Sequence, residues 1–482
     1  MPNDGTLAAP EVREGTPGRS LVLAACIMAT FMAAVESTIV ATTIPTIVGE
    51  LGGFNLFSWV FTIFLLTQAV SIPIYGRLAD LYGRKPVFFI GAGLFLTGST
   101  LCGLAWDMPS LVSTILGDIY TPTERAKIQG LISSVFGVAA VIGPSMGAFL
   151  IQHVSWRVVF WVNLPIGAAA IVMIALFLKE RVQHREHQVD WLGSLLLLIA
   201  FGGLMLAMVQ GGTLGHDVLW TVSIVGGVAL VALLVHETRV REPMLPLELW
   251  RNRIIVTGSL GSCGTGAAMM GVSAFLPAYV QGAMGYSAIA GGLVLGAMSV
   301  SWAIASIVGG RIMVRTSYRL VAVIGAAFLA FGCLMLTLLS PSDGPIWAAV
   351  ASFVMGIGMG FANTVFIVAI QASVPWRQRG AATSSNMFLR FVGQAAGAAG
   401  CGAVLNATMI GMDPSAPRAV DKLMDAASRA AMPADLVSHL TDVMAASLHN
   451  VYLLALVFSL LTLVVAACIP PRLSPRHQTT RN

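Results

Sequence analysis

Charged residues are scarce in this sequence. Asp, Glu, Lys and Arg make up only 10% of its 482 residues, whereas 56% are hydrophobic. A soluble globular domain carries roughly 25% charged residues, so this chain could not cover a water-exposed surface of its size. The shortage excludes a soluble protein and, with many long apolar runs, predicts a polytopic membrane protein. The 50 glycines fit this class, because small residues let helices pack closely in lipid.

Paired cysteines and nucleotide-binding motifs are also missing. The six cysteines lie singly in or beside apolar runs, with no C-x-x-C pair, so neither disulfides nor a metal site is expected. The eight histidines show no ligand spacing. No G-x-x-x-x-G-K-[ST] motif occurs, which argues against direct ATP drive. We therefore predict no cofactor and no metal, and we attribute the net charge of +5 to membrane orientation rather than to nucleic-acid binding.

The number of membrane spans depends on one short segment. Thirteen apolar runs are long enough to cross a bilayer, but a further run at 108–120 has about ten apolar residues, half of what a crossing needs. With fourteen spans and a cytoplasmic N-terminus, 22 of the 27 Lys and Arg fall on the cytoplasmic side, whereas thirteen spans leave only nine there. The positive-inside rule therefore favours fourteen.

The chain repeats itself, and the repeat explains the short segment. The basic loop "GRLADLYGRK" at 76–85 is echoed by "GRIMVRTSYR" at 310–319. The interval Arg77–Pro122 covers 45 residues, whereas the corresponding interval Arg311–Pro375 covers 64, so the first is shorter by 19 residues, or about one span. Most of the fourth helix is therefore missing from this sequence, either by a genuine deletion or because a segment was left out.

The duplication predicts an all-α membrane fold of two pseudo-symmetric six-helix bundles with an inserted two-helix hairpin. Between the last two spans lies a long external loop, in which Pro433 separates two amphipathic stretches that we expect to be short surface helices. The expected parts are a cytoplasmic tail at 1–19, an N-terminal bundle at 20–178, the inserted helices at 179–253, a C-terminal bundle at 254–470 that includes the external loop at 405–447, and a cytoplasmic tail at 471–482.

Three short motifs resemble those of a known transporter family. "GRLADLYGRKP" at 76–86 resembles the signature loop of the major facilitator superfamily, "GVAAVIGPSMGA" at 137–148 resembles its antiporter motif, and "ESTIVATTIPTI" at 36–47 resembles a motif in helix 1 of the fourteen-helix drug:proton antiporters of the QacA/EmrB type. The resemblance covers nearly the whole chain. It departs at helix 4, where that family has an Arg and a Gln-Gly-x-Gly motif implicated in proton coupling, and at Glu36, where the family usually has Asp.

Glu36 is the only acidic residue deep within a predicted span, about 10 Å from its outer end. A carboxylate at that depth is costly unless it is protonated, paired or exposed to a watery cavity, so Glu36 is a candidate for proton coupling or for binding a cationic substrate. The alternative is a structural Glu hydrogen-bonded by Ser37 and Thr38.

The loop at 76–86 contains a candidate cytoplasmic latch. Topology alone accounts for Arg84 and Lys85, but it does not account for Asp80, which lies four residues before Arg84 and is suited to pair with it. Asp118 is expected on the same membrane face, so Asp80, Arg84 and Asp118 are predicted to hold the cytoplasmic ends together in the outward-open state. The predicted gating motif comprises Gly76, Arg77, Asp80, Gly83, Arg84, Lys85 and Asp118.

The antiporter-like motif combines Pro144 with the glycines Gly137, Gly143 and Gly147. Proline removes a backbone donor and bends the helix, and small residues at this spacing allow tight packing. Ordinary helix packing alone would explain the pattern. In an antiporter, the same tight packing around the bend would also prevent leakage through the transporter.

A substrate cavity is predicted from scattered residues in the second half. Arg390 lies within a span and must have a partner, which could be a ligand in the cavity or backbone carbonyls, and Gln394 follows one turn later. The methionines and aromatic residues could line a pliable apolar pocket or could simply face lipid. The candidate cavity residues are Met269, Met270, Phe275, Tyr279, Asn363, Arg390 and Gln394.

The resemblance implies a proton-coupled multidrug efflux antiporter, not an enzyme, that exports hydrophobic, cationic small molecules by alternating access across a cell inner (plasma) membrane. Its expected partners are the substrate, protons and the lipid bilayer, without nucleic acid, and we expect a monomer with both termini in the cytoplasm. The alternatives are a lipid, siderophore or metabolite exporter of the same fold, or, from another class, a membrane sensor or intramembrane enzyme.

Overall fold

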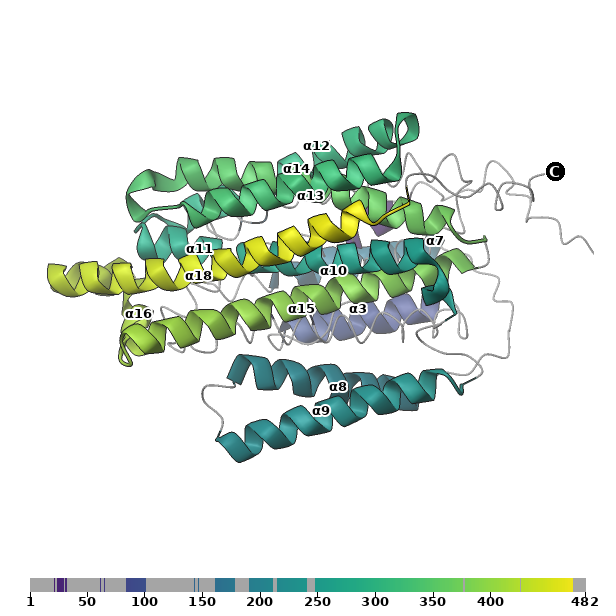
Figure 1. Ribbon diagram of the computed structural model, residues 1–482, viewed down its shortest axis with the longest axis horizontal. Helices are drawn as coiled ribbons and strands as arrows, with labels where there is room; N and C mark the ends of the chain where they lie inside the picture. The colour runs from purple at the N-terminus through teal and green to yellow at the C-terminus, as the bar shows by residue number, and fades with distance from the viewer. Residues whose placement is uncertain are drawn as a thin grey trace, which may run out of the picture.

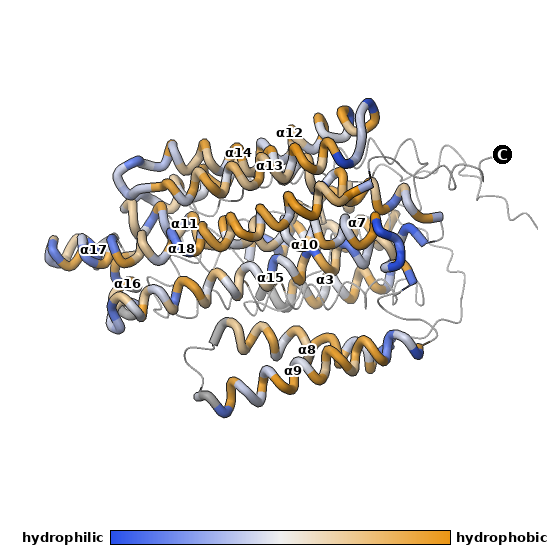
Figure 2. The backbone as a smooth tube through the Cα atoms, viewed as in Figure 1, coloured by the Kyte–Doolittle hydropathy of each residue, from blue (hydrophilic) through white to orange (hydrophobic). Residues whose placement is uncertain are grey.

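The computed structural model describes residues 84–100, 161–177, 190–210, 215–240, 248–375, 378–424 and 426–470, with short stretches within 21–32 and the single residues Phe61, Leu65, Gly143 and Met146. Throughout these ranges the regular structure is helical, which confirms the predicted all-α class for the described part of the chain. The helices run roughly along the long axis of the molecule (Figure 1). Apolar residues follow their lengths, and hydrophilic residues gather towards their ends (Figure 2).

In chain order the helices are α3 (Arg84–Thr100), α7 (Asn163–Phe177), α8 (Trp191–Gln210), α9 (His216–Glu237), η2 (Leu249–Arg251), α10 (Arg253–Ser273), α11 (Leu276–Ala278), η3 (Tyr279–Ala283), α12 (Ala288–Arg315), α13 (Tyr318–Thr337), η4 (Pro341–Asp343), α14 (Gly344–Ala372), α15 (Arg379–Met412), α16 (Ala416–Met424), α17 (Ala426–Ala431) and α18 (Ala434–Ala467). Among the described residues, seven helical segments are long and apolar enough to cross a membrane: α9, α10 through η3, α12, α13, η4 with α14, α15 and α18.

Six of these seven segments lie side by side in the second half of the chain. α14 packs against α12 and α13, α15 packs against α10, and α18 packs against α10 and α13. Polar residues between the spans begin several of the helices: the side chains of Asn252, Ser287 and Ser317 each accept a hydrogen bond from a backbone N–H in the first turn of α10, α12 and α13. The alternation of apolar runs with capping residues thus produces the up-and-down order of the bundle.

The contact between α10 and α15 depends on small residues. A Cβ added at Gly393 or Gly397 would collide with the backbone carbonyl of Cys263 or Ala267 on the facing helix. Lipid offers apolar side chains no hydrophobic gain from association, so close backbone approach at a Gly-x-x-x-Gly pattern is what holds such helices together. This spacing brings the polar residues of α15 directly against α10.

α8 and α9 pack against each other and lie along one side of the bundle, next to α15 (Figure 1). Gly203 and Gly226 face each other where the two helices meet, and an added Cβ at either would lie 3.2 Å from a backbone atom of the other helix. The ring of Phe201 on α8 meets the ring of Phe388 on α15 edge to face, with 5.8 Å between centroids. The number of spans, and the role of this pair as an inserted hairpin, remain predictions.

The external loop differs from its sequence-based prediction in one respect. As expected, short helices α16 and α17 precede Pro433. The stretch after Pro433 is not a second separate surface helix, because α18 begins at Ala434 and continues unbroken into the membrane-spanning segment. The first N–H groups of a helix have no partner within the helix, so a proline at the start loses no hydrogen bond. Pro433 therefore begins the long helix instead of interrupting it.

Candidate functional site: a buried polar stripe and its surroundings

Most candidates from the first half of the chain lie outside the described residues. These are Glu36, Gly76, Arg77, Asp80, Gly83, Asp118, Gly137, Pro144 and Gly147. Arg84 is the first residue of α3, and Gly143 is helical and buried. The proposed latch and the antiporter-like bend therefore remain predictions.

Lys85 makes a contact that the sequence did not predict. Its Nζ donates a hydrogen bond of 2.8 Å to the carbonyl oxygen of Ala175, two residues before the end of α7. The last carbonyls of a helix have no intrahelical donor and carry partial negative charge, so a cation there is favourable. Lys85 thus ties the start of α3 to the end of α7 and is more than a marker of membrane orientation.

Three of the predicted cavity residues come together between α10 and α15. The Nε2 of Gln394 lies 3.8 Å from the sulfur of Met269, and Arg390 lies one turn before Gln394 on the same helix. A Cβ added at Gly266 on α10 would lie 2.5 Å from the carbonyl oxygen of Arg390 and 3.1 Å from the Cγ of Gln394. α10 therefore passes directly beside these two polar residues.

A further member of this group, Asn386, was not among the predicted residues. Its Nδ2 donates 2.8 Å to the Oγ of Ser262 and 3.4 Å to the carbonyl of Gly258, both on α10. Asn386, Arg390 and Gln394 are spaced by four residues, so they share one face of α15. We call them the polar stripe. The repeated spacing of polar residues within an apolar span was the signal that could have revealed Asn386.

The polar stripe contains more hydrogen-bonding capacity than its described neighbours satisfy. Within the stripe, the Nε of Arg390 and the Oδ1 of Asn386 are shielded from solvent and form no hydrogen bond within the described structure. The same holds for two hydroxyls outside the stripe, that of Ser259 on α10 and that of Ser385 on α15. An unsatisfied buried polar group costs roughly 1–3 kcal/mol, so such a concentration of them calls for a ligand, water or a change of conformation.

Phe275 and Tyr279 occupy a different environment. Both are almost fully buried, and the Tyr279 hydroxyl donates 3.1 Å to the carbonyl of Leu339 while its ring lies 6.0 Å from that of Tyr452. Pro277 lies between them, where α10 gives way to α11 and the π-helix η3. Both aromatic residues therefore pack in the core around an irregular helix end, and so does Met270.

Asn363 is the remaining predicted cavity residue. It lies on α14, is 6% exposed, and its Oδ1 has no hydrogen-bond partner within the described structure. No described contact joins it to the polar stripe.

An apolar pocket of about 560 Å³ lies between α8, α9 and α15. Its one hydroxyl, that of Ser223, donates 2.8 Å to the carbonyl of Leu219 and so offers the pocket no free donor. The lining residues are Phe201, Leu204, Met205, Ala207, Met208, Leu219, Trp220, Ser223, Val392 and Ala396. No sequence pattern indicated this pocket, because a helix that is apolar all round does not reveal which of its sides faces a gap.

At the α16–α17 end of the bundle, α16 and α17 cover the irregular end of the α10–η3 segment. Arg429 on α17 donates 2.7 Å to the carbonyl of Gly282 and 3.3 Å to that of Gln281. Burial lowers the pKa of Arg429 from its usual value. Apolar side chains of α16, including Val420 and Leu423, are buried against the same region.

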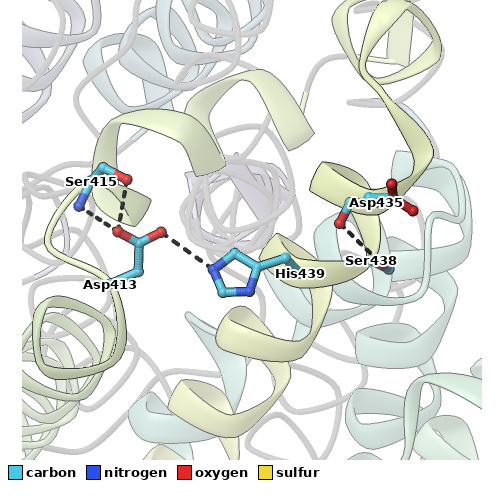
Figure 3. Close-up of polar contacts among 5 residues, drawn as sticks. All are labelled: Asp413, Ser415, Asp435, Ser438 and His439. Carbon is cyan, nitrogen blue, oxygen red and sulfur yellow. Dashed lines mark hydrogen bonds and ion pairs between the residues drawn. The ribbon is translucent and has the colours of Figure 1, made fainter.

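A second polar contact joins the end of α15 to α18 (Figure 3). Asp413 accepts hydrogen bonds from the hydroxyl and backbone N–H of Ser415, and its other oxygen lies 3.3 Å from the Nε2 of His439. The bonds from Ser415, followed by the contact with His439, lower the pKa of Asp413 from its usual value. Nearby on α18, the hydroxyl of Ser438 donates to the carbonyl of Asp435.

The architecture defines a multi-pass membrane protein built from packed spanning helices. The sequence pattern of the Major Facilitator Superfamily matches residues 26–398, and the chain belongs to that family of membrane transporters; it is not an enzyme.

Two relatives from Bacillus subtilis (strain 168) are similar over most of their lengths. Multidrug resistance protein 3 is 31% identical over 474 residues, covering 90% of this chain and 92% of the relative. Multidrug transporter protein MdtP is 32% identical over 412 residues, covering 81% and 76%. These identities, sustained along most of the chain, support the same family assignment.

Solved structures share the fold. A bacterial homolog of the human lysosomal transporter Spinster, in an inward-facing and unoccupied conformation, superposes with a TM-score of 0.61 at 14% identity and covers 94% of this chain and 98% of its own. A nucleoside transporter superposes with a TM-score of 0.58 at 11% identity and covers 93% and 99%. At these identities the likeness concerns the fold alone.

Proposed function

We propose that this chain is a proton-coupled multidrug efflux antiporter of the fourteen-helix type, which exports hydrophobic, cationic small molecules. The observation that carries the proposal is the 31% identity with Multidrug resistance protein 3 over 90% of the chain. A relation of that extent includes both halves of the transporter, so it bears on the whole transport cycle and not on a single motif.

Proton coupling in this proposal depends on Glu36. It is the only acidic residue deep within a predicted span, and the cost of a buried carboxylate makes its protonation sensitive to its surroundings. Exchange would follow if Glu36 binds a proton from one side of the membrane and releases it when a cationic substrate binds from the other. Alternating access provides the two exposures.

The gating motif at 76–86 and Asp118 would close the cytoplasmic side, and Pro144 with its neighbouring glycines would keep helix 5 tightly packed and free of leaks. The proposed topology places both termini in the cytoplasm of a cell with an inner (plasma) membrane, with a bundle at 20–178, an inserted hairpin within 179–253 and a bundle at 254–470. A monomer contains a complete transport pathway in this arrangement.

The coupling proposal is tested in everted membrane vesicles energised by a pH gradient. Vesicles with the wild-type chain should accumulate rhodamine 6G, a hydrophobic cation, and a protonophore should abolish the accumulation. Glu36→Gln should lose the gradient-driven component while the protein remains folded and in the membrane. Unchanged gradient-driven accumulation in Glu36→Gln would remove Glu36 as the coupling group. Absence of rhodamine 6G transport by the wild-type chain would argue against multidrug export.

A further inference from the structure

Arg390 is a cation within a helix that is long and apolar enough to span a membrane. α15 begins at Arg379, and a rise of about 1.5 Å per residue puts Arg390 about 16 Å along it. α15 has 34 residues and is about 50 Å long, so Arg390 lies about a third of the way along it. A charge within a membrane span is costly and, where it occurs, usually serves a substrate or ion pathway.

The guanidinium has no polar partner in the part of the chain that the structure describes. Its Nε is shielded from solvent and unpaired, and the described residues make no hydrogen bond or ion pair with its terminal nitrogens. The sequence left two roles open for Arg390, binding a ligand or binding backbone carbonyls. The described structure contains no such carbonyl bond, which favours a ligand.

The surroundings of Arg390 leave its donors available. The Cζ of Arg390 lies 5.1 Å from the centroid of the Phe391 ring. Stacking on an aromatic ring uses the face of the guanidinium, whereas its five N–H groups lie in the plane and point outwards. Arg390 is partly buried, and its backbone carbonyl lies against Gly266 of α10.

Gln394 adds a second donor one turn away. Among the residues that the structure describes, the only partner of its Nε2 is the sulfur of Met269 at 3.8 Å, which is a weak acceptor. Asn386, in contrast, is already engaged with Ser262. The polar stripe therefore presents a fork of charged donors, a neighbouring amide and nearby apolar surface, and its described members include no carboxylate that would neutralise the charge.

We propose that Arg390, supported by Gln394, binds the anionic group, a carboxylate or sulfonate, of an amphipathic organic substrate. The planar fork of arginine matches the two oxygens of such a group, and the apolar part of the molecule would lie against Met269 and Phe391. The headgroup of a bilayer lipid stays at the interface, whereas Arg390 lies about 16 Å along α15 from its start. The assignment deepens the proposed export function, because it adds anions to a substrate range that Glu36 alone would restrict to cations.

The test measures binding to the purified full chain by fluorescence anisotropy. Two dyes with the same xanthene ring serve as probes: fluorescein, which is anionic, and rhodamine 6G, which is cationic. Arg390→Met should weaken fluorescein binding by roughly tenfold to hundredfold, the range for a hydrogen bond to a charged group, and should leave rhodamine 6G binding within about twofold. Arg390→Lys, which keeps the charge but loses the fork, should fall between wild type and Arg390→Met.

Two further variants separate a ligand site from a structural role. Gln394→Glu places a carboxylate one turn from Arg390, so it should pair with the guanidinium and weaken fluorescein binding without removing the cation. Arg315→Met removes an exposed cation at the end of α12 and should change the binding of neither dye.

Three results would overturn the proposal: no fluorescein binding by the wild-type chain, unchanged fluorescein binding in Arg390→Met, or equal loss of both dyes in that variant. Its failure can be distinguished from failure of the export function. If fluorescein binding depends on Arg390 but vesicles do not accumulate rhodamine 6G, the anion site stands and multidrug cation export does not.

Discussion

Replacing Arg429 with alanine should loosen the cover that α16 and α17 form over the end of η3. Arg429 on α17 donates hydrogen bonds to the carbonyls of Gly282 and Gln281 in η3. Gly285 has φ +74° and lies next to the Arg429 guanidinium. A Cβ at this position would lie 2.9 Å from a terminal nitrogen of Arg429, so the contact needs glycine there.

The magnitude follows from the exposure of this contact. A buried hydrogen bond from a charged donor contributes roughly 1.5–3 kcal/mol. Because Arg429 is partly exposed, solvent screening reduces the contribution of its two hydrogen bonds to about 1–2 kcal/mol in total. Since 1.4 kcal/mol corresponds to a factor of ten, Arg429→Ala should raise the open population of the cover roughly tenfold.

The assay follows the reaction of a thiol placed under the cover. Met424 is 9% exposed, and its Cε would lie 3.0 Å from a Cβ at Gly282, so Met424→Cys reports opening of α16 from η3. Its labelling rate, measured by mass spectrometry of the peptide, should rise roughly tenfold in the Arg429→Ala background, by the same factor as the open population. Lys422→Ala is the matched control, because it removes an exposed cation from α16. Equal rates with and without Arg429, or the same increase in Lys422→Ala, would refute the reasoning.

Three further predictions concern other parts of the structure. The bonds from Ser415 lower the pKa of Asp413, so the contribution of Asp413 to stability is present above the usual value of 3.8 and is lost as pH falls through the lower folded pKa. The protection of the Ser415 and Ala416 amides against hydrogen exchange, measured relative to their intrinsic rate at each pH, should therefore stay constant from pH 8 to pH 5 and fall only in stronger acid. A loss of protection already between pH 7 and pH 6 would contradict this. Gly393→Ala forces a Cβ against the Cys263 carbonyl and should lower the free energy of unfolding by about 1–3 kcal/mol, measured as a lower thermal unfolding midpoint. The control Gly411→Ala has open space around its Cβ and should not lower the midpoint. Equal midpoints for the two variants would contradict the close packing of α10 and α15. In intact cells, cysteines placed at 84, 183, 240 or 315 should be protected from an impermeant reagent and one at 425 should react, and external labelling at 183 and 315 would contradict the fourteen-span topology.

Hydropathy is a local signal, and it predicted the helical segments of the second half well. Three of the thirteen apolar runs, near 254–280, 286–309 and 319–340 in the sequence, correspond to α10 through η3, α12 and α13. In the structure, Ser287 and Ser317 cap the first turns of α12 and α13. Pro433 was recognised as a boundary, but the continuation of α18 into the membrane was not, because an amphipathic stretch and an apolar span can form one helix.

The environment of single residues in the candidate site was harder to predict. Tyr279 resembles a pocket residue by type, yet its hydroxyl bonds to a carbonyl 60 residues away, a contact set by tertiary packing. The same holds for Lys85 and Ala175, which are 90 residues apart. Arg390 and Gln394 could be chosen as candidate cavity residues from the sequence, because polar residues at helical spacing within an apolar span are energetically costly and so indicate a functional role.

Substrate-dependent proton movement tests the central claim most directly. The purified chain is reconstituted into liposomes with an acidic lumen and a pH-sensitive dye, and rhodamine 6G is then added to the outside. An antiporter should speed the loss of luminal protons as the dye enters, and the increase should disappear in Glu36→Gln. Uptake of rhodamine 6G with no change in the rate of proton loss would contradict proton-coupled export by this chain.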